Sequence, residues 1–186
     1  MQIKFILIVI IILQSAIING QKSKLNFYSA VQAGILEGEE GSSFQLQSIN
    51  GIKYKTWATG IGVGLDYYHT RSIPLFLDIR KSIFNRSKSP FVYASGGYHF
   101  PWSTTKDEFG YENSDSKAGI YYDAGIGYRL PVLKNNSLFF SAGYSLKRFS
   151  QEVSYYTYCL TGNCPEYKQR FDYSFRRISI RTGLQF

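Results

Sequence analysis

The chain has 186 residues and a formal net charge of +8, and 17% of its residues are aromatic. This length fits one domain or a small pair of domains, while 16 Tyr and 14 Phe give far too much apolar surface for a disordered chain. The 17 Gly show no period of three, which excludes a collagen-like fibre, and two Cys are too few for a disulfide scaffold or a four-ligand zinc site. A Gly-rich, aromatic, all-β domain is the class that remains.

The first twenty residues have the layout of a secretory signal peptide. Lys4 precedes an uninterrupted apolar run from Phe5 to Leu13, and small or polar residues follow as far as Gly20. A membrane-spanning helix, which is the alternative, needs about 18 to 20 apolar residues. The sequence therefore predicts a signal peptide over residues 1–20, cleaved after Gly20, and an exported domain over residues 21–186.

Beyond this segment, apolar residues alternate with small or charged ones at a period of two, which is typical of strands with two different faces. In Gly119–Leu130, for example, Ile120, Tyr122 and Ala124 alternate with Tyr121 and Asp123. Eight segments show this alternation, and each is close to the length that a tilted strand needs to cross a bilayer. In chain order they are Phe27–Ile35, Phe44–Tyr54, Thr59–Tyr67, Ile73–Arg80, Val92–Phe100, Gly119–Leu130, Leu138–Lys147 and Ile178–Phe186.

The two faces of these segments distinguish between two all-β folds. A soluble sandwich, the alternative, has Lys, Glu, Thr and Ser on its solvent face, whereas here the second face is rich in glycine. Glycine is expected in the narrow lumen of an eight-stranded barrel, where only small side chains and a few paired charges fit. Aromatic residues border the apolar face as membrane-interface girdles do: Trp57, Tyr67, Tyr68, Tyr98, Phe100, Trp102 and Tyr128. We therefore predict an all-β, eight-stranded antiparallel up-and-down transmembrane β-barrel, with its apolar face toward lipid.

The later connections alternate in length as this model requires, while the first and third, near Glu37–Ser42 and His69–Arg71, are short without breaking the pattern. Pro101–Ala118 and Ser150–Arg170 are long and are expected to be extracellular loops. Lys53–Lys55, Ser82–Ser89 and Pro131–Asn136 are short, basic and free of acids, as expected for solvated periplasmic turns. Attraction to anionic lipid phosphates is the alternative interpretation of this basic side. The basic residues are scattered rather than gathered into a stripe, so nucleic acid is not an expected partner.

Seven charged residues fall on the glycine-rich face and predict an ion network inside the lumen. A buried charge without a partner costs several kcal/mol, so these side chains are expected to pair across the barrel. They are Asp66, Asp78, Arg80, Asp123, Arg129, Lys147 and Arg181. A general acid–base site is a weaker interpretation of the same residues, and a lumen filled in this way predicts no open pore.

The remaining reactive side chains give weak signals. Cys159 and Cys164 are separated by four residues that include a Gly-Asn turn in the last long loop, which predicts a disulfide in an oxidising compartment. A free or metal-binding pair is the alternative. His69 and His99 lack a serine at the spacing that resembles lipid deacylases, so structural roles are expected for both.

The stretches Val92–Trp102, Tyr122–Pro131, Phe140–Lys147 and Arg177–Phe186 resemble small outer-membrane β-barrel proteins of Gram-negative bacteria, the OmpA/OmpX-type eight-stranded barrels. The resemblance covers about Leu25–Phe186 and implies the class strongly but the function weakly, because members range from structural proteins to adhesins and lipid-modifying enzymes. In that family the last strand is read by the barrel assembly machinery. Ile180, Thr182, Leu184 and Phe186 match that pattern.

We therefore expect a monomeric, non-catalytic protein of the outer membrane with a structural or surface-interaction role and no cofactor or metal. Its expected partners are outer-membrane lipids, the barrel assembly machinery and an extracellular ligand of the two long loops. A lipid-modifying enzyme of the deacylase or acyltransferase kind, using His69, is the first alternative. A small-solute channel is the second.

Overall fold

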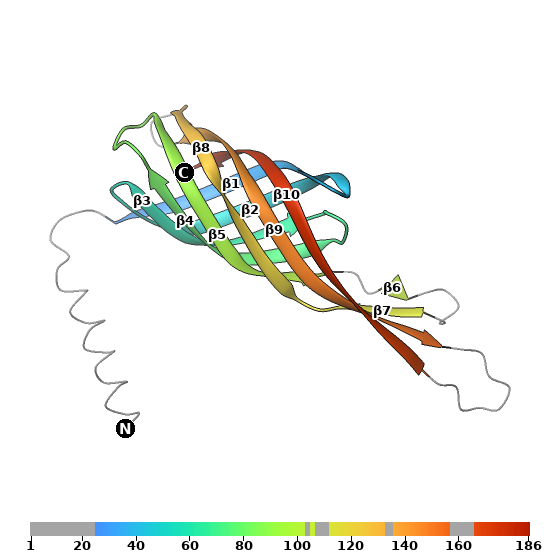
Figure 1. Cartoon of the computed structure of the whole chain (residues 1–186). Helices are drawn as coiled ribbons and strands as arrows, with labels where there is room; N and C mark the ends of the chain where they lie inside the picture. The colour runs from blue at the N-terminus through green and yellow to red at the C-terminus, as the bar shows by residue number, and fades with distance from the viewer. Residues whose placement is uncertain (1–24, 103–104, 107–111, 133–135, 157–165) are drawn as a thin grey trace, which may run out of the picture.

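The computed structural model describes residues 25–102, 105–106, 112–132, 136–156 and 166–186 (Figure 1). Eight of its strands close into one antiparallel barrel in which each strand pairs with the next along the chain. These strands are β1 (Asn26–Gly38), β2 (Gly41–Tyr54), β3 (Trp57–Asp66), β4 (Ser72–Ser82), β5 (Ser89–Pro101), β8 (Gly119–Pro131), β9 (Ser137–Tyr156) and β10 (Glu166–Gln185). The barrel closes where β10 pairs with β1, from Ala30 opposite Gln185 to Gly38 opposite Arg177. The predicted up-and-down fold with eight strands is confirmed.

Burial alternates along every barrel strand because the two faces of each strand meet different surroundings. The apolar residues point outward and are widely exposed: Ile61, Leu77, Ile126 and Ile180 each keep more than 60% of their surface accessible. The polar and glycine positions point inward. Among the described residues, no helix is long and apolar enough to cross a membrane.

One residue assigned to the aromatic girdle lies elsewhere. Tyr68 is 1% exposed, and its ring packs inside against Phe175 at 5.6 Å between ring centroids. The prediction was wrong because Tyr68 has the same inward parity as Asp66, and this alternation continues for two residues beyond the end of β3 at Asp66. Tyr67, which has the outward parity, is exposed as expected.

Glycine leaves room in the lumen for large rings. A Cβ atom on Gly62 would lie 2.3 Å from the Phe76 ring, and a Cβ on Gly127 would lie 2.3 Å from the Phe91 ring. Both distances are far below van der Waals contact, so neither position accepts a side chain without moving an aromatic residue. The glycine-rich face is thus the space that the lumen aromatics occupy.

Strands β9 and β10 run 20 residues each and extend well beyond the rest of the barrel, toward the lower right of Figure 1. The short strands β6 (Thr105–Lys106) and β7 (Glu112–Ser116) join them, so that a small sheet in the order β10-β9-β7-β6 projects from one end of the barrel. We call this sheet the extension. The barrel end from which it projects is named the upper mouth, although it points down in Figure 1, and the opposite end, at the upper left of the figure, is named the lower mouth.

The extension corrects the expected loop at Ser150–Arg170, because most of that segment continues the two strands. Pairing runs from Phe149 opposite Tyr173 to Tyr156 opposite Glu166. Phe149, Tyr173 and Phe175 pack together, while charged residues such as Arg170 and Asp172 occupy the other face and gave the segment its loop-like composition.

Candidate functional site

The inward face of the barrel brings together the three acids predicted for the lumen. Asp66 on β3, Asp78 on β4 and Asp123 on β8 are each 1% exposed. A carboxylate buried to this degree is stable only when cations and hydrogen-bond donors surround it. Each of the three is held by an arginine.

Asp78 is bound by the neighbouring residues of its own strand and of the next. Arg80 Nε donates to Asp78 Oδ1 at 2.8 Å, and Ser95 Oγ donates to Asp78 Oδ2 at 2.8 Å. The Arg80 guanidinium also donates to Gln32 Oε1 at 3.0 Å and lies 5.0 Å from the centre of the Phe139 ring. Rings on several strands thus surround this cation and fill the lumen at its level.

Asp123 is bound by an arginine two strands away. Arg181 Nη2 on β10 lies 2.5 Å from Asp123 Oδ1, and Arg181 also donates to the Tyr93 hydroxyl and to Gln47 Oε1. Gln47 in turn accepts a hydrogen bond from Gln32, the residue that contacts Arg80. The Asp78 and Asp123 groups therefore form one network that spans the lumen.

Asp66 holds two cations near the upper mouth. Arg177 Nη1 lies 2.7 Å from Asp66 Oδ2, and Lys147 Nζ lies 3.9 Å from the same oxygen. Lys147 also donates to the backbone carbonyls of Tyr68 at 3.1 Å and Thr70 at 3.0 Å. This lysine thereby fixes the β3–β4 turn over the lumen.

Arg177 is the lumen residue that sequence reasoning missed. The predicted last segment starts at Ile178, although Arg177 has the same parity as Ser179 and Arg181. Following the alternation one residue upstream finds it. With Arg177 included, the buried set holds three acids and five bases: Asp66, Asp78, Asp123, Arg80, Arg129, Lys147, Arg177 and Arg181.

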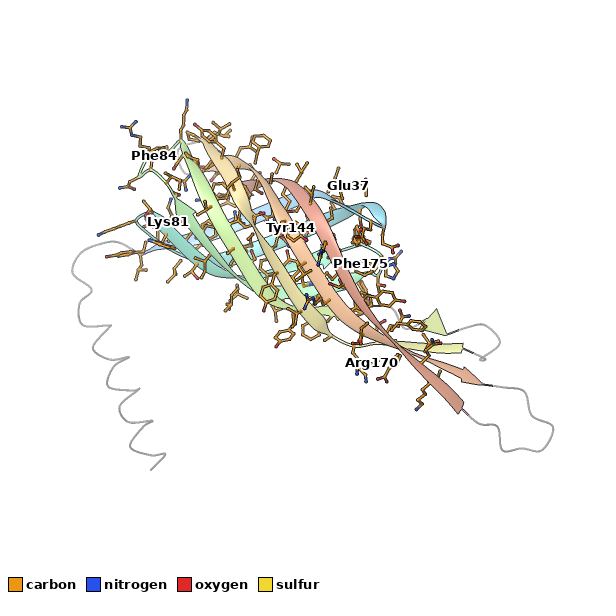
Figure 2. All side chains as sticks on the ribbon, in the orientation of Figure 1. Glu37, Lys81, Phe84, Tyr144, Arg170 and Phe175 are labelled. Carbon is orange, nitrogen blue, oxygen red and sulfur yellow. The ribbon has the colours of Figure 1, made fainter. Side chains whose placement is uncertain are left out.

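A cluster of rings closes the upper mouth above Asp66. Leu36, Tyr68, Phe149 and Phe175 are buried together, and Tyr173 stacks on Phe149 at 5.2 Å between centroids. Figure 2 shows Phe175 at this end, near the point where β10 leaves the barrel.

The lower mouth is built differently. Arg129 on β8 is 9% exposed, and its guanidinium donates to the backbone carbonyls of Arg86 at 3.2 Å and Ser87 at 3.4 Å in the β4–β5 turn. A polar cavity of about 300 Å³ lies beside it and is lined by Lys53, Lys55 and Arg86 as well. Figure 2 shows Phe84 of the same turn and Lys81 at this end of the barrel, far from Arg170 on the extension.

The two histidines occupy separate places at the upper end. His69, in the β3–β4 turn at a φ of 58°, packs 4.9 Å from the Phe175 ring, and its Nδ1 lies 3.4 Å from a Glu40 carboxylate oxygen. His99 is buried on β5, and its Nε2 lies 3.0 Å from the Arg148 carbonyl oxygen. Neither histidine is hydrogen-bonded to a Ser or Thr hydroxyl of the described residues, and those residues contain no group of three or more metal-ligating side chains.

The remaining predicted sites are the assembly signal, the cysteine pair and the signal peptide. Ile180, Thr182 and Leu184 point outward on β10, and Phe186 extends the ladder by exchanging backbone hydrogen bonds with Ser29 of β1, at 2.8 and 3.4 Å. Cys159 and Cys164, like the signal peptide predicted over residues 1–20, lie outside the described residues. The disulfide between the two cysteines and the cleavage of the signal peptide remain predictions.

The fold is that of small eight-stranded outer-membrane barrels, and solved structures of several such proteins superimpose on this chain. The outer membrane protein OprG from Pseudomonas aeruginosa matches with a TM-score of 0.61 and 9% identity, over 89% of this chain and 98% of OprG. Neisserial surface protein A matches with a TM-score of 0.57 and 12% identity, over 88% and 98%. AlkL, solved in DMPC bilayers, matches with a TM-score of 0.50 and 11% identity, over 90% and 94%.

Identities this low show the shared fold alone. No protein-family model matches the chain, and neither does any curated protein. The function must therefore be argued from this chain's own residues.

Proposed function

We propose that this protein is an integral outer-membrane barrel without catalytic activity, whose role is to present the extension at the cell surface. The observation that carries the proposal is the combination of an apolar outer wall with a sheet that continues past one end of it. The wall supplies the anchor, and the extension supplies the surface for a partner.

The outer wall has the chemistry of a lipid-facing surface. Large side chains such as Phe27, Leu75, Tyr98 and Tyr144 are each about half exposed or more, on different sides of the barrel. Water would make so large an apolar surface an aggregation site, whereas hydrocarbon matches it. Closure between β1 and β10 leaves the barrel wall without an unpaired edge, which a spanning sheet requires.

The extension differs from the wall because charges cover one of its faces. Lys117 pairs with Glu152 at 2.5 Å, and Arg170 pairs with Asp172 at 3.2 Å. All four side chains are at least one-third exposed, as expected for a water-facing sheet. A solvated, ordered sheet offers a partner a larger rigid surface than a loop of equal length.

Protease treatment of intact cells tests location and orientation together. Trypsin should cleave at Lys168 or Arg170 in the extension while leaving the barrel fragment in the membrane fraction. Lys81 and Lys88, near the lower mouth, should be cut only after the outer membrane is permeabilised. Cleavage at Lys88 in intact cells, or recovery of the exported chain in a detergent-free soluble fraction, would contradict the proposal.

The filled lumen supports a closed barrel rather than a solute channel. The linked Asp78 and Asp123 groups and the rings around Arg80 occupy its middle. Planar-bilayer recordings of the refolded protein should therefore give no stable open-channel currents. Large, long-lived conductance steps would favour the channel instead.

A further inference from the structure

The lower mouth holds a group of cations that no described carboxylate neutralises. Lys53, Lys55, Arg86 and Arg129 line its cavity, and no acid is among the described lining residues. Among the described residues, Arg129 donates to the two backbone carbonyls of the β4–β5 turn and pairs with no carboxylate, and Lys53 is half-buried without an ion pair. Cations gathered in a partly desolvated cavity attract an anion more strongly than the same charges spread over a surface.

The nearest buried acid does not serve this cavity. Asp78 lies two residues further from the lower mouth than Arg80 on β4. Arg80 and Ser95 already bind both of its carboxylate oxygens. The positive charge at the lower mouth therefore faces outward, toward whatever enters the cavity.

A second, smaller pocket adjoins this cavity and contains a hydroxyl without a hydrogen-bond partner in the described part of the chain. This pocket, of about 20 Å³, shares Lys53 and Arg129 with the cavity and is also lined by Tyr28 and Arg80. The Tyr28 side chain is 2% exposed, and its hydroxyl has no hydrogen-bond partner among the described residues. A buried hydroxyl of this kind costs free energy unless an acceptor reaches it.

Volume, charge and donor geometry together define the ligand class. The outer chamber, at about 300 Å³, is at the small end of the range for small-molecule sites. Arginine and lysine bind phosphate oxygens through charge-assisted hydrogen bonds, and four cations suit an anion with more than one charge better than a single carboxylate. We propose that the lower mouth is a binding site for a phosphate group, carried either by a soluble anion or by a phospholipid headgroup.

Titration of the intact barrel with inorganic phosphate tests this site. The refolded protein is placed in micelles of an amine-oxide detergent, which contains no phosphate, at ionic strength held constant with chloride. Amide NMR shifts near Lys53, Ser82 and Ser87 should saturate with phosphate concentration. Shifts that follow chloride equally, or that never saturate, would overturn the proposal.

Matched variants then locate the binding. Lys53→Gln and Arg129→Gln should each weaken phosphate binding at least fivefold, because each removes one cation from the cavity. Lys88→Gln removes an exposed cation of the β4–β5 turn. This lysine does not line the cavity, so the variant should change the affinity for phosphate less than twofold. Arg129→Gln also loses its hydrogen bonds to the β4–β5 turn, so heat-modifiable gel migration must first show that this variant folds. If the variant does not fold, Lys53→Gln alone decides the test. Equal weakening by Lys88→Gln and Lys53→Gln would reduce the site to surface attraction and overturn it.

The source of the phosphate is distinguished in lipid nanodiscs. If a headgroup occupies the mouth, nanodiscs with phosphatidylglycerol should shift the same amides and weaken the titration with inorganic phosphate. If the ligand is soluble, the titration should be unchanged by that lipid. Either result supports a phosphate site, and the absence of a saturable response to both probes rejects it.

Discussion

The two mouths of the barrel each use a buried cation to bind the backbone of a turn, and they differ in whether a carboxylate partners that cation. At the upper mouth Lys147 binds the carbonyls of Tyr68 and Thr70, and at the lower mouth Arg129 binds those of Arg86 and Ser87. Lys147 shares the carboxylate of Asp66, whereas Arg129 has no carboxylate partner among the described residues. This difference matches the access of water to the two cations. Lys147 is covered by the ring cluster and needs a counter-charge, whereas Arg129 lies beside an open polar cavity and does not.

Removing the counter-charge of the upper mouth should have the largest effect. Asp66→Asn leaves Arg177 and Lys147 buried without an anion, and we expect the free energy of unfolding to fall by about 3 to 5 kcal/mol. Urea unfolding of the refolded barrel in micelles, followed by tryptophan fluorescence, measures it. Asp172→Asn, which breaks an exposed pair on the extension, serves as the control and should be indistinguishable from the unchanged protein. If Asp66→Asn proves as stable as Asp172→Asn, the Asp66 group contributes nothing to the free energy of unfolding.

The second-largest loss of stability is expected from removing one ring of the cluster that closes the upper mouth. Phe175→Ala removes a buried ring that contacts Tyr68, Phe149 and Tyr173, and it should cost about 3 kcal/mol. Phe84→Ala at the lower mouth removes a ring that is 55% exposed and should change stability by less than about 0.5 kcal/mol. The same unfolding measurement compares the two, and similar losses would show that the lower mouth is also a packed core.

Replacing the two turn-binding cations compares the mouths directly. Lys147→Met loses two charge-assisted hydrogen bonds while Arg177 still neutralises Asp66, so a loss of about 1 to 2 kcal/mol is expected. Arg129→Met loses two longer hydrogen bonds but also removes an uncompensated charge, and the net change should stay below about 1 kcal/mol. A larger loss for Arg129→Met would reverse the comparison.

The smallest effect concerns the charged face of the extension. Hydrogen bonds from Ser150 and then from Arg170 hold the pKa of the Asp172 carboxyl below its usual value of 3.8. Because the folded-state pKa is lowered, the stabilisation is full above that usual value and is lost as the pH falls through the folded-state pKa. An NMR titration of the carboxyl carbon in Ser150→Ala should return the pKa toward 3.8, and an unchanged pKa would remove Ser150 as the main cause.

Much of the barrel could be predicted because period-two alternation is a local property. The inward positions of Asp66, Asp78 and Asp123 follow directly from parity within their strands. The extension was not predicted, since its charged face gives residues 150–170 the composition of a loop. Only the pairing of β9 with β10 and the ring cluster on the opposite face reveal the strands.

The partners inside the lumen could not be predicted from one sequence. Which arginine reaches which acid depends on how the strands stagger around the barrel, as in the contact between Arg181 on β10 and Asp123 on β8. The inward position of Tyr68 follows from its parity with Asp66, whereas the hydrogen bond from Lys147 Nζ to its carbonyl does not. Parity thus identifies the charged residues that point inward, and the stagger of the strands determines which of them form ion pairs.

The seam between β1 and β10 has a kinetic consequence. It joins Ala30 to Gln185 and continues through the backbone bonds of Ser29 with Phe186. Contacts so distant along the chain form slowly, because a large loop must close before any of them is gained. A chain stopped before Arg177 would therefore keep β1 as an open edge, prone to pairing with other molecules. Membrane insertion of this barrel should accordingly wait for the last strand to be delivered.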